Sequence, residues 1–449
     1  MSTPGRQYRV SDVLRHRDFA LLWSGQAVSL VGDGIFVVAL ALEALHLSHS
    51  PALLSVVVAA RMVPMLLLLL LGGAISDRLP RRLTMLTSDA VRGLAVGAVA
   101  ILVHARALHP GELVAMAIVF GSADAFFFPA STAIVPEVVP SSLLTQANAL
   151  SFSMAVTAQS LIGPALGGLL VGVIGVAGCF TADAASFALS ALSLALMRVR
   201  GREVVPAGDA TTDGAATDGA NATGGDAATV PSGSVLREVK AGLSFTFRRP
   251  QRWLWVTILA ASVGNAAAFT PQAVLTPLLI ERVLHGSGFE LGLVFAAGGV
   301  GGAVGAVVAG RLGTPRFTVT WMWAAWSLAA ALAALYGIAP RVWVVGALAT
   351  GVSFLLFYGT TQWTTLMQTL VPRHLLGRVS SVDWLFSLAL SPIGALLAGV
   401  LAGAIGTRTT LLLGGGLATA VGACLFVPGV RDPERAAAGT VAHDVAEAP

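Results

Sequence analysis

The sequence predicts an all-α integral membrane protein with twelve transmembrane helices in two pseudo-symmetric six-helix bundles. Three observations predict this fold class. Hydrophobic residues make up 55% of the 449 residues, while charged residues make up only 11% and the mean hydropathy is +0.80. A soluble domain usually carries about 25% charged residues, and a chain this apolar could not cover its surface with polar groups. Twelve apolar segments follow one another along the chain, and landmarks of the first six recur in the last six.

Each apolar segment is long enough to cross a bilayer as a helix. The hydrocarbon core is about 30 Å thick and needs about 20 residues per helix. The first segment is too long for the core of a signal peptide, and no small-residue cleavage site follows it, so we expect it to stay in the membrane. The predicted spans are 19–45, 51–75, 83–104, 112–135, 145–174, 176–197, 252–280, 288–312, 317–338, 342–369, 379–404 and 407–428.

The distribution of Arg and Lys predicts that both termini are cytoplasmic. With the N-terminus inside, 21 of the 27 basic residues lie on the cytoplasmic side and four lie outside. Such an excess marks the cytoplasmic loops of membrane proteins. We therefore expect a multi-pass protein of a bacterial cell (inner) membrane. The four outer residues are Arg106, Arg282, Arg341 and Arg408.

A polar linker divides the two bundles. Residues 203–234 are rich in Ala, Thr, Gly and Asp, and such a stretch cannot offset the entropy of ordering it. The expected organisation is a cytoplasmic N-terminus (1–18), an N-terminal bundle (19–197), a cytoplasmic linker (198–251), a C-terminal bundle (252–428) and a cytoplasmic tail (429–449).

The two bundles repeat each other at a constant offset of 232 residues. Val31-Gly32-Asp33 falls on Val263-Gly264-Asn265, and Gly167 falls on Gly399. Six helices in each half give parallel repeats about an axis along the membrane normal. In such transporters the substrate binds near the midplane, between the halves.

Four short motifs carry a resemblance to a known family. Gly73–Arg82 holds a Gly, an Asp-Arg pair and two further arginines, and Gly163–Gly168 reads Gly-Pro-Ala-Leu-Gly-Gly. Leu30–Asp33 reads Leu-Val-Gly-Asp, and Phe180–Phe187 reads Phe-Thr-Ala-Asp-Ala-Ala-Ser-Phe. With these motifs the chain resembles the major facilitator superfamily, in the branch that holds drug- and macrolide-efflux and enterobactin-export proteins. The resemblance implies the fold of that superfamily and a role in export.

The resemblance also implies a conformational gate after the second helix. Asp77 stands at a helix end on the cytoplasmic side, where its carboxylate would face the N-terminus of the eleventh helix in the closed state. Arg78, Arg81 and Arg82 would shape this latch. The alternative is that these residues only anchor the loop by the positive-inside rule.

The fifth helix carries a second candidate gate. A proline removes one helical hydrogen bond and bends the helix, and glycines let a neighbouring backbone approach closely. Gln159 stands where the corresponding motif has a glycine. Ordinary packing of small residues is the alternative. The gate residues proposed here are Gly163, Pro164, Gly167 and Gly168.

Charged residues near mid-depth are candidates for proton coupling, because an ionised group in the bilayer is costly unless it is paired or hydrated. At ~1.5 Å per residue, Asp33, Arg61 and Asp124 lie near mid-depth of helices 1, 2 and 4. A carboxyl group in a low-dielectric cavity can bind a proton near neutral pH, and an approaching guanidinium would release it. We expect Asp33 to carry the proton, with Arg61 as its partner and Asp124 as second candidate. The alternative is a static Asp33–Arg61 pair.

Three further charges lie within predicted spans. Asp89 and Arg92 are three residues apart on one face of helix 3, in its cytoplasmic half, and predict a structural ion pair. Helix 4 lacks the arginine that many proton-coupled exporters carry, so Arg61 or Arg92 would take its place. Asp183 lies a few residues below the outer surface in helix 6, and the resemblance places helices 3 and 6 at the periphery.

Aromatic and amide residues predict the substrate site. The C-terminal half has no charge at mid-depth, so its wall should be apolar with a few amides, which suits a bulky hydrophobic ligand. Packing or lipid contact is the alternative for each aromatic residue. The candidates are Asn265, Phe269, Gln272, Tyr358, Gln362, Trp363 and Phe127.

Several classes of protein are excluded by the sequence. An ATP-driven transporter needs a phosphate loop that ends in Gly-Lys-Ser/Thr, whereas the only lysine, Lys240, precedes Ala241. The two cysteines, Cys179 and Cys424, lie in separate apolar segments, so neither a disulfide framework nor a metal cluster is expected. Basic residues sit between apolar segments, which argues against nucleic acid as a partner. An enzyme is not expected, nor is a cofactor.

The predicted function is therefore secondary active transport. We expect a proton-coupled exporter of bulky hydrophobic or amphipathic small molecules (a drug, a macrolide or a secondary metabolite) that works by alternating access. The proton gradient supplies the energy. The expected partners are the lipid bilayer, the substrate and protons, and the protein is expected to be a monomer. The alternatives are a dedicated exporter of a siderophore or other metabolite, an importer, and a membrane sensor or scaffold with the same fold.

Overall fold

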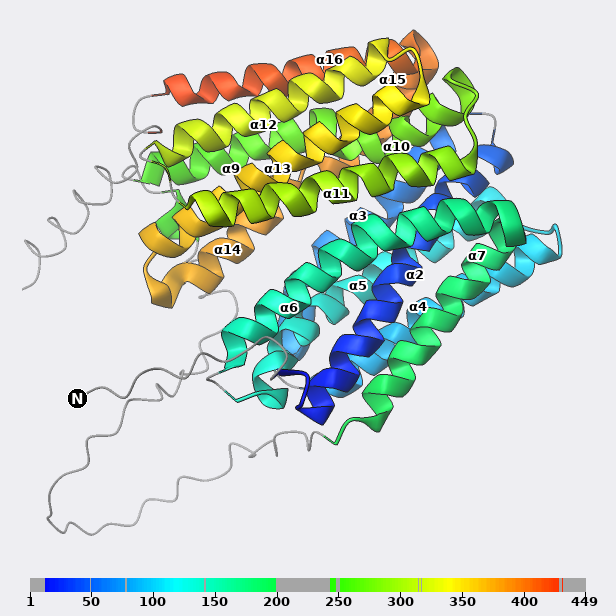
Figure 1. Ribbon diagram of the computed structural model, residues 1–449, viewed down its shortest axis with the longest axis horizontal. Coiled ribbons are helices and arrows are strands. Elements are labelled where there is room, and N and C mark those ends of the chain that lie inside the picture. Colours follow the sequence, from blue (N-terminus) through cyan, green and yellow to red (C-terminus); the bar gives the residue numbers. More distant parts are fainter. Residues whose placement is uncertain are drawn as a thin grey trace, which may run out of the picture.

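The computed structural model describes residues 13–48, 50–76, 79–140, 143–198, 243–247, 251–313, 315, 317–427 and 430. Within these ranges the regular structure is helical (Figure 1). Asp77 and Arg78, two of the expected gate residues, lie outside the described residues, as does most of the expected linker.

The first half of the chain forms long helices joined by short loops. They are α2 (Arg17–Leu47), α3 (Ala52–Ser76), α4 (Arg81–His104), α5 (Pro110–Val138), α6 (Leu144–Thr157), the π-helical turn η2 (Ala158–Ile162) and α7 (Gly163–Leu196).

The second half repeats this pattern with more interruptions. Its helices are α9 (Arg252–Gly264), η4 (Asn265–Phe269), α10 (Thr270–Leu278), η5 (Leu279–Val283), α11 (Gly288–Leu312), α12 (Thr318–Ala334), η6 (Leu335–Ile338), α13 (Val342–Leu370), α14 (Arg373–Leu388), α15 (Ser391–Ile405), α16 (Thr407–Val421) and η7 (Gly422–Phe426).

The predicted membrane fold is confirmed. Eleven stretches of the described chain are long and apolar enough to span a membrane, and one of them, Gln146–Leu196, is 51 residues long. Within it the backbone of Gly175 has φ 71°, a left-handed value that favours glycine. The chain reverses there (Figure 1), so this stretch makes two crossings and the total is twelve. The predicted spans 145–174 and 176–197 meet at the same residue.

Wide π-helical turns precede two prolines. The turn η2 comes directly before Gly163-Pro164, and η4 comes directly before Thr270-Pro271. A proline has no N–H to donate, and its ring clashes with the carbonyl four residues earlier. A π-helical turn relieves this conflict by inserting one more residue. The predicted bend of helix 5 therefore takes the form of a π-helical turn.

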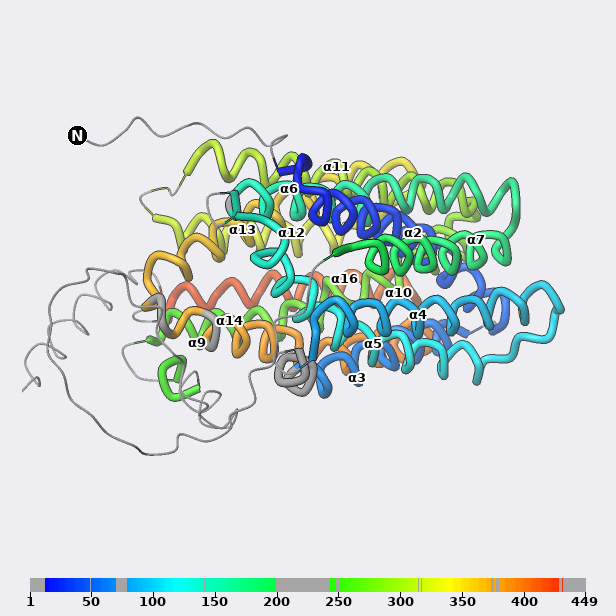
Figure 2. Tube along the Cα trace, turned by 90° about the horizontal axis from the view of Figure 1, so that it is seen from below, coloured from blue at the N-terminus to red at the C-terminus, as the bar shows by residue number. Residues whose placement is uncertain are grey.

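The termini of the helices, and the loops that join them, lie at two opposite ends of the molecule. Arg17, Arg81, Arg198, Arg252 and Arg311 lie at the starts or ends of helices on one side, which we call the basic end. The opposite side, which we call the far end, holds the loops 48–51, 105–109, 284–287 and 339–341 and the reversal at Gly175. Figure 2 shows the helices side by side along the axis that joins these two ends.

The halves lie one beside the other, with α2–α7 in the lower part of Figure 1 and α9–α16 in the upper part. Helix α11 packs along α7 and η2, and α15 packs along α3. One hydrophobic cluster runs through both halves and includes Phe36 and Phe120 from the first and Val274 and Val345 from the second.

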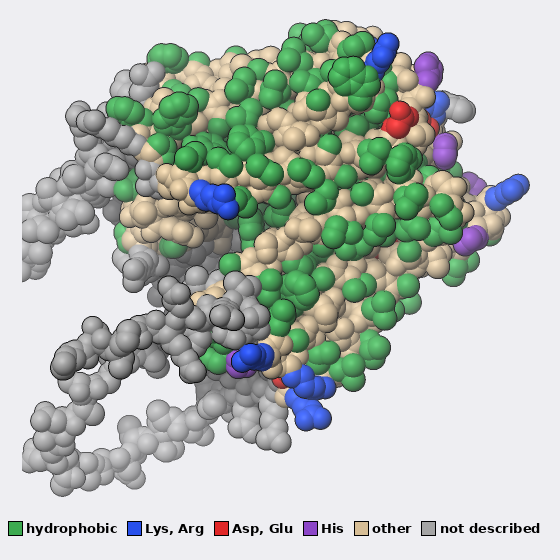
Figure 3. Space-filling view, viewed as in Figure 1, with side chains coloured by type: hydrophobic (Ala, Val, Ile, Leu, Met, Phe, Trp, Pro, Cys, Tyr) green, Lys and Arg blue, Asp and Glu red, His purple; other side chains and the backbone are tan. Residues whose placement is uncertain are grey.

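Apolar side chains also cover the outside of the molecule. Leu67, Leu94 and Val173 are 72%, 75% and 72% exposed. Figure 3 shows hydrophobic side chains over the visible face, with charged side chains toward the two ends. An apolar belt of this kind is the surface expected of a protein whose solvent is lipid.

Candidate functional site

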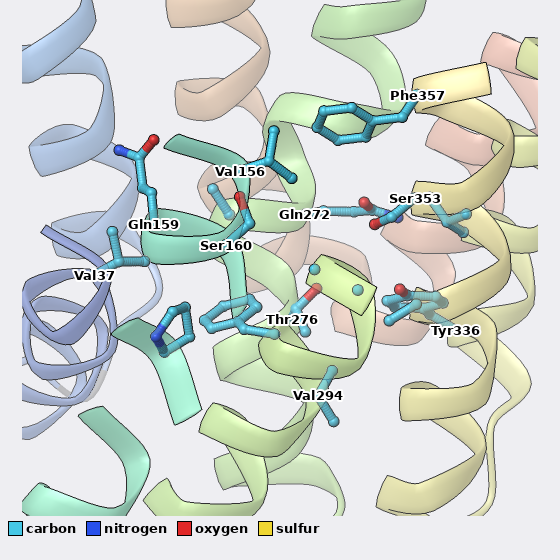
Figure 4. A pocket seen from close by; sticks show the side chains of 17 residues that line it. Val37, Val156, Gln159, Ser160, Gln272, Thr276, Val294, Tyr336, Ser353 and Phe357 are labelled. Carbon is cyan, nitrogen blue, oxygen red and sulfur yellow. The ribbon is translucent and has the colours of Figure 1, made fainter. Parts of the chain in front are cut away.

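A cavity of about 270 Å³ lies between the two halves. The first half contributes Val37 from α2, Val156 from α6, Gln159 and Ser160 from η2, and Pro164 from α7. The second half contributes residues of α10, α11, η6 and α13, and Figure 4 shows the two walls facing each other. The residues from the second half are Gln272, Ala273, Thr276, Val294, Phe295, Gly298, Gly299, Tyr336, Ala349, Val352, Ser353 and Phe357.

The cavity wall is apolar with a few isolated polar groups. Phe295 and Phe357 supply aromatic surface, while Gln159, Gln272 and Ser353 supply amides and a hydroxyl. The Nε2 atom of Gln272 is buried and has no hydrogen-bond partner in the part of the chain that the structure describes. Such a wall suits a ligand held mainly by apolar contact and oriented by a few hydrogen bonds.

Of the predicted substrate residues, Gln272 lines this cavity and the others lie elsewhere. Phe269 packs against the hydrophobic core, and Asn265 donates a hydrogen bond of 3.0 Å to the carbonyl of Ser387. The aromatic ring of Phe127 lies against the guanidinium of Arg92.

The three candidates on α13 are also outside the cavity lining. Gln362 donates to the carbonyl of Gly313 over 2.9 Å, and the indole of Trp363 donates to Asp383 Oδ2 over 2.9 Å. Tyr358 is half-buried. Helical spacing explains the difference, because Ala349, Ser353 and Phe357 repeat every four residues on one face of α13.

Sequence reasoning missed most polar groups of the cavity. Thr276 lies one helical turn after Gln272 on α10, so the helical period could have found it. Gln159 departed from the helix-5 motif, and that departure was itself a signal. Neither Ser160 nor Tyr336 was marked by any signal in the sequence. Ser160 lies in a π-helical turn that was not predicted.

A second polar site lies inside the first half and joins α3, α4 and α5. Asp124 Oδ2 accepts from Arg61, and Asp124 Oδ1 accepts from Arg92 Nη1 at 3.1 Å. Arg92 also donates to Asp89 Oδ1, whose second oxygen accepts from Ser190 at 2.7 Å. The side chains of Asp89, Arg92 and Asp124 are 0%, 4% and 1% exposed. The structure therefore contains the Asp89–Arg92 ion pair and extends it through Asp124 to Arg61.

Aromatic rings enclose this network. The guanidinium of Arg61 lies 4.4 Å from the centre of Phe120. That of Arg92 lies 4.2 Å from Phe127 and 4.7 Å from Phe187. Cation–π contacts of desolvated guanidiniums are worth about 2 kcal/mol, so the rings stabilise charges that the bilayer would disfavour. Arg61 and Arg92 were expected to take the place of the arginine that helix 4 lacks, and both form ion pairs with Asp124 of α5.

Asp33 has a different partner arrangement from the one expected. It is 5% exposed, its Oδ1 atom has no hydrogen-bond partner among the described residues, and Arg61 is paired with Asp124. The predicted Asp33–Arg61 pair is therefore replaced by an Arg61–Asp124 pair. Val37, one helical turn after Asp33 on α2, lines the cavity.

The described gate residues on α4 bind within the first half. Arg81 donates to the carbonyl of Ala133 and to Glu137 Oε1 at 3.0 Å. Arg82 donates to the carbonyl of Leu194 at 2.6 Å and to that of Ala195. Carbonyls at a helix C-terminus have no partner within the helix and attract cations. Arg82 thus caps α7, while Arg81 ties α4 to α5.

The glycines of helix 5 lie at two close helix crossings. Gly163 meets Gly34 of α2, where an added Cβ would come 2.7 Å from the neighbouring Cα. Gly168 meets α11, where an added Cβ would lie 2.9 Å from the carbonyl oxygen of Gly288 and 3.0 Å from the Cα of Gly292. The second crossing joins the two halves near the far end.

Further contacts join the halves at the far end. Arg282 of η5 donates a 2.6 Å hydrogen bond to the carbonyl of Leu45, in the last turn of α2. Glu281 Oε1 lies 3.8 Å from His46 Nε2. Together with the crossing at Gly168, these contacts join the two halves at the far end.

The sequence profile of the Major Facilitator Superfamily matches residues 22–389. The chain belongs to this superfamily. Its membership makes it a secondary transporter, a multi-pass membrane protein and not an enzyme, as the sequence predicted.

Proteins named as exporters are similar to this superfamily member over most of its length. It is 27% identical over 405 residues to the multidrug efflux pump Tap of Mycolicibacterium fortuitum, covering 88% of this chain and 90% of that protein. It is 23% identical to macrolide efflux protein A of Streptococcus pyogenes, with coverages of 89% and 93%. It is 26% identical to the enterobactin exporter EntS of Shigella boydii, with coverages of 86% and 85%.

Solved structures of superfamily members share the fold. A bacterial homologue of the lysosomal transporter Spinster superposes with a TM-score of 0.65 at 14% identity, covering 98% of this chain and 99% of that one. The nucleoside transporter NupG gives a TM-score of 0.64 at 11% identity, with coverages of 91% and 98%.

Proposed function

We propose that this protein exports bulky hydrophobic or amphipathic molecules across a bacterial cell membrane in exchange for protons. The observation that carries the proposal is the position of Asp33, one helical turn from Val37 in the wall of the cavity. Asp33 is a buried carboxyl group on the helix that contributes Val37 to the cavity wall, four residues away, and it does not itself line the cavity. Protonation of Asp33 and occupation of the cavity can therefore influence each other.

The cavity supports a substrate that is largely apolar. Phe295, Phe357 and the valines of α11 and α13 offer contact area, and none of the described residues that line the space is charged. Relatives named for export of drugs, macrolides and enterobactin support the export direction and the substrate class.

The basic end supports the orientation of the protein. Cytoplasmic loops carry the excess of Arg and Lys, so we assign the basic end and both termini to the cytoplasm. The contacts at Gly168 and Arg282 then lie on the outer side, and they support the assignment of an inward-facing state. Such a state receives substrate from the cytoplasm and has yet to open to the outside.

A transport assay in everted membrane vesicles tests the proposal. Respiration acidifies the vesicle lumen and quenches a fluorescent amine, and an exporter that exchanges protons for a substrate relieves the quench. We expect a macrolide, a dye or a siderophore to relieve the quench in wild type but not in Asp33→Asn. Glu43→Gln is the matched control, because Glu43 is a half-buried carboxyl on the same helix, away from the network.

Binding of the same compound separates coupling from folding. Asp33→Asn should keep its affinity for the substrate and its expression level while losing proton exchange. Wild-type quench relief in Asp33→Asn would contradict the proposal. Quench relief by a siderophore and by none of the drugs would instead assign a dedicated metabolite as the substrate.

A further inference from the structure

Hydrogen-bonding side chains from three elements of the second half meet at one part of the cavity wall. Gln272 and Thr276 come from α10, Tyr336 comes from η6 and Ser353 comes from α13. Figure 4 shows all of them across the cavity from Val37 of the first half. We call Gln272, Thr276, Tyr336 and Ser353 the polar patch.

The polar patch lacks hydrogen-bond partners within the described part of the chain. The hydroxyls of Thr276, Tyr336 and Ser353 form no hydrogen bond with a described residue, and neither does the Nε2 atom of Gln272. Thr276 and Tyr336 are each only 3% exposed. A buried polar group that stays unpaired destabilises the fold, so a hydrogen-bonding partner inside the cavity would stabilise this patch.

The first half contributes a more apolar wall. Val37, Val156 and Pro164 supply apolar surface, and Gln159 and Ser160 of η2 are the polar members of this wall. The two walls therefore differ in chemistry. A ligand that lies between them makes mostly apolar contacts with the first half and hydrogen bonds with the second half.

The described lining of the cavity offers no charge to a charged ligand. Arg61 and Arg92 are bound to Asp124 in ion pairs, and Asp33 lies behind the wall to which Val37 belongs. An ionised group that leaves water without meeting an opposite charge loses much of its solvation free energy. The cavity therefore favours a ligand that is uncharged.

The hydrogen-bonding capacity of the polar patch determines which ligand groups fit it. A ligand that displaces water from polar groups loses affinity unless its own groups reproduce the hydrogen bonds of that water. The Nε2 atom of Gln272 can only donate, so it needs an acceptor, whereas the three hydroxyls can donate or accept. A carbonyl group with hydroxyl groups beside it meets both requirements.

We propose that the cavity binds uncharged amphipathic molecules that carry carbonyl and hydroxyl groups along one edge. The inference rests on the proposed function and narrows its substrate class. The polar edge of the ligand lies against the polar patch of the second half, and its apolar side lies against the first half. Thr276, Tyr336 and Ser353 are then specificity-determining residues, because their hydroxyls distinguish such a ligand from an apolar cation of similar size.

Equilibrium binding of two probes to the purified full-length protein tests the inference. Chloramphenicol is uncharged and carries an amide carbonyl and two hydroxyl groups on one side of an aromatic ring. Tetraphenylphosphonium is an apolar cation without a hydrogen-bonding group. We expect wild type to bind chloramphenicol at least about tenfold more tightly than tetraphenylphosphonium, because only chloramphenicol can pair with the polar patch.

Variants that remove one hydroxyl at nearly constant volume should change the two affinities in opposite directions. Thr276→Val and Tyr336→Phe should each weaken chloramphenicol binding by about fivefold, which corresponds to one hydrogen bond. Both should strengthen tetraphenylphosphonium binding, since that probe no longer leaves a hydroxyl unpaired. Tyr358→Phe is the matched control, because Tyr358 is a half-buried tyrosine of α13 outside the cavity lining, and it should leave both affinities unchanged.

Several outcomes would overturn the inference. One is tighter binding of tetraphenylphosphonium than of chloramphenicol by wild type, or no binding of chloramphenicol at all. Another is an unchanged affinity for chloramphenicol in both Thr276→Val and Tyr336→Phe. Equal losses for both probes would mean that the hydroxyls support the fold and do not recognise a ligand.

The transport assay keeps this inference separate from the proposed function. If chloramphenicol relieves the quench in wild type but binds Thr276→Val and Tyr336→Phe as tightly as wild type, the polar patch is refuted and proton-coupled export stands. If the affinities change as expected but chloramphenicol does not relieve the quench in wild type, proton coupling is refuted and the polar patch stands.

Discussion

Arg61 donates two hydrogen bonds to the same oxygen of Asp124, from Nη2 at 2.9 Å and from Nε at 3.2 Å. This ion pair joins α3 to α5 where the two helices cross. Gly121 makes the crossing possible, because a Cβ there would collide with the carbonyl of Arg61. The side chain of Asp124 is 1% exposed and that of Arg61 is 26% exposed.

Replacement of Arg61 by Gln is expected to destabilise the fold. A hydrogen bond to a charged group contributes about 1.5–3 kcal/mol, and Asp124 would keep its second partner, Arg92. Reversible unfolding in mixed detergent micelles measures the loss. In a double-mutant cycle, Arg61→Gln combined with Asp124→Asn should cost less than the sum of the single variants. Additive losses would show that the two side chains do not interact.

Replacement of Gln272 by Ala is expected to weaken substrate binding by about tenfold, which corresponds to about 1.4 kcal/mol. The amide of Gln272 has an unpartnered Nε2 at the cavity wall and can donate to a ligand. Equilibrium binding to purified protein measures the effect. Gln362→Ala is the control, since Gln362 bonds to Gly313 away from the cavity. It should lower stability and leave affinity unchanged, and equal affinity losses in both variants would refute the assignment.

Gly168→Ala is expected to open the far end between the halves. The added methyl would lie 2.9 Å from the carbonyl oxygen of Gly288, and overpacking costs about 1–3 kcal/mol, which should raise exposure of this interface at least about fivefold. Gly172→Ala is the matched control on the same helix, because a Cβ there meets nothing within 4 Å.

The rate of alkylation of a cysteine at position 171 measures this opening. Val171 packs against Gly288, and the native cysteines, Cys179 and Cys424, would first be replaced. Gly168→Ala should accelerate alkylation and Gly172→Ala should not. Equal rates in the two variants would mean that the Gly168 crossing does not hold the far end closed.

Arg282→Gln is expected to shift the protein toward the state that is open at the far end. The hydrogen bond from Arg282 to Leu45 joins the halves only while the far end is closed. Its loss therefore destabilises the closed state alone, by about 1.5–3 kcal/mol. Distances between spin labels on the far-end loops measure the populations. Arg106 is an exposed arginine at the same end, and Arg106→Gln, the control, should leave the distance distribution as in wild type. A wild-type distance distribution in Arg282→Gln would show that the Arg282–Leu45 contact does not stabilise the closed far end.

The fold was predictable because it depends on features that sequence displays directly. Apolar segments of sufficient length and a repeat at one offset led to twelve helices, including the reversal at Gly175. The π-helical turns were not predictable, because they depend on how Pro164 and Pro271 are accommodated within continuous helices. Ser353 and Tyr336 line the cavity in place of the predicted residues because of how their helices are rotated. An apolar sequence does not indicate that rotation.

The charged site was predictable in its members but only in part in its pairing, because the Asp89–Arg92 pair lies within one helix and the Arg61–Asp124 pair joins two. Asp33, Arg61, Asp89, Arg92 and Asp124 stood out because charges are rare in membrane spans. Which carboxyl meets which guanidinium depends on the rotation and tilt of helices. Asp183 was placed by its depth alone, whereas its burial against Gly32 of α2 depends on which face of the helix carries it.

The acceptor of the Arg282 hydrogen bond is a main-chain carbonyl, and every amino acid carries one. No codon change at position 45 can delete that acceptor, so loss of the contact by direct substitution can arise only at position 282. In a genetic selection for variants with altered transport direction or rate, mutations that disable this contact should therefore accumulate at a single codon of the second half. Suppressors that restore the closed far end would have to build a new contact elsewhere, since the first half has no side chain to restore.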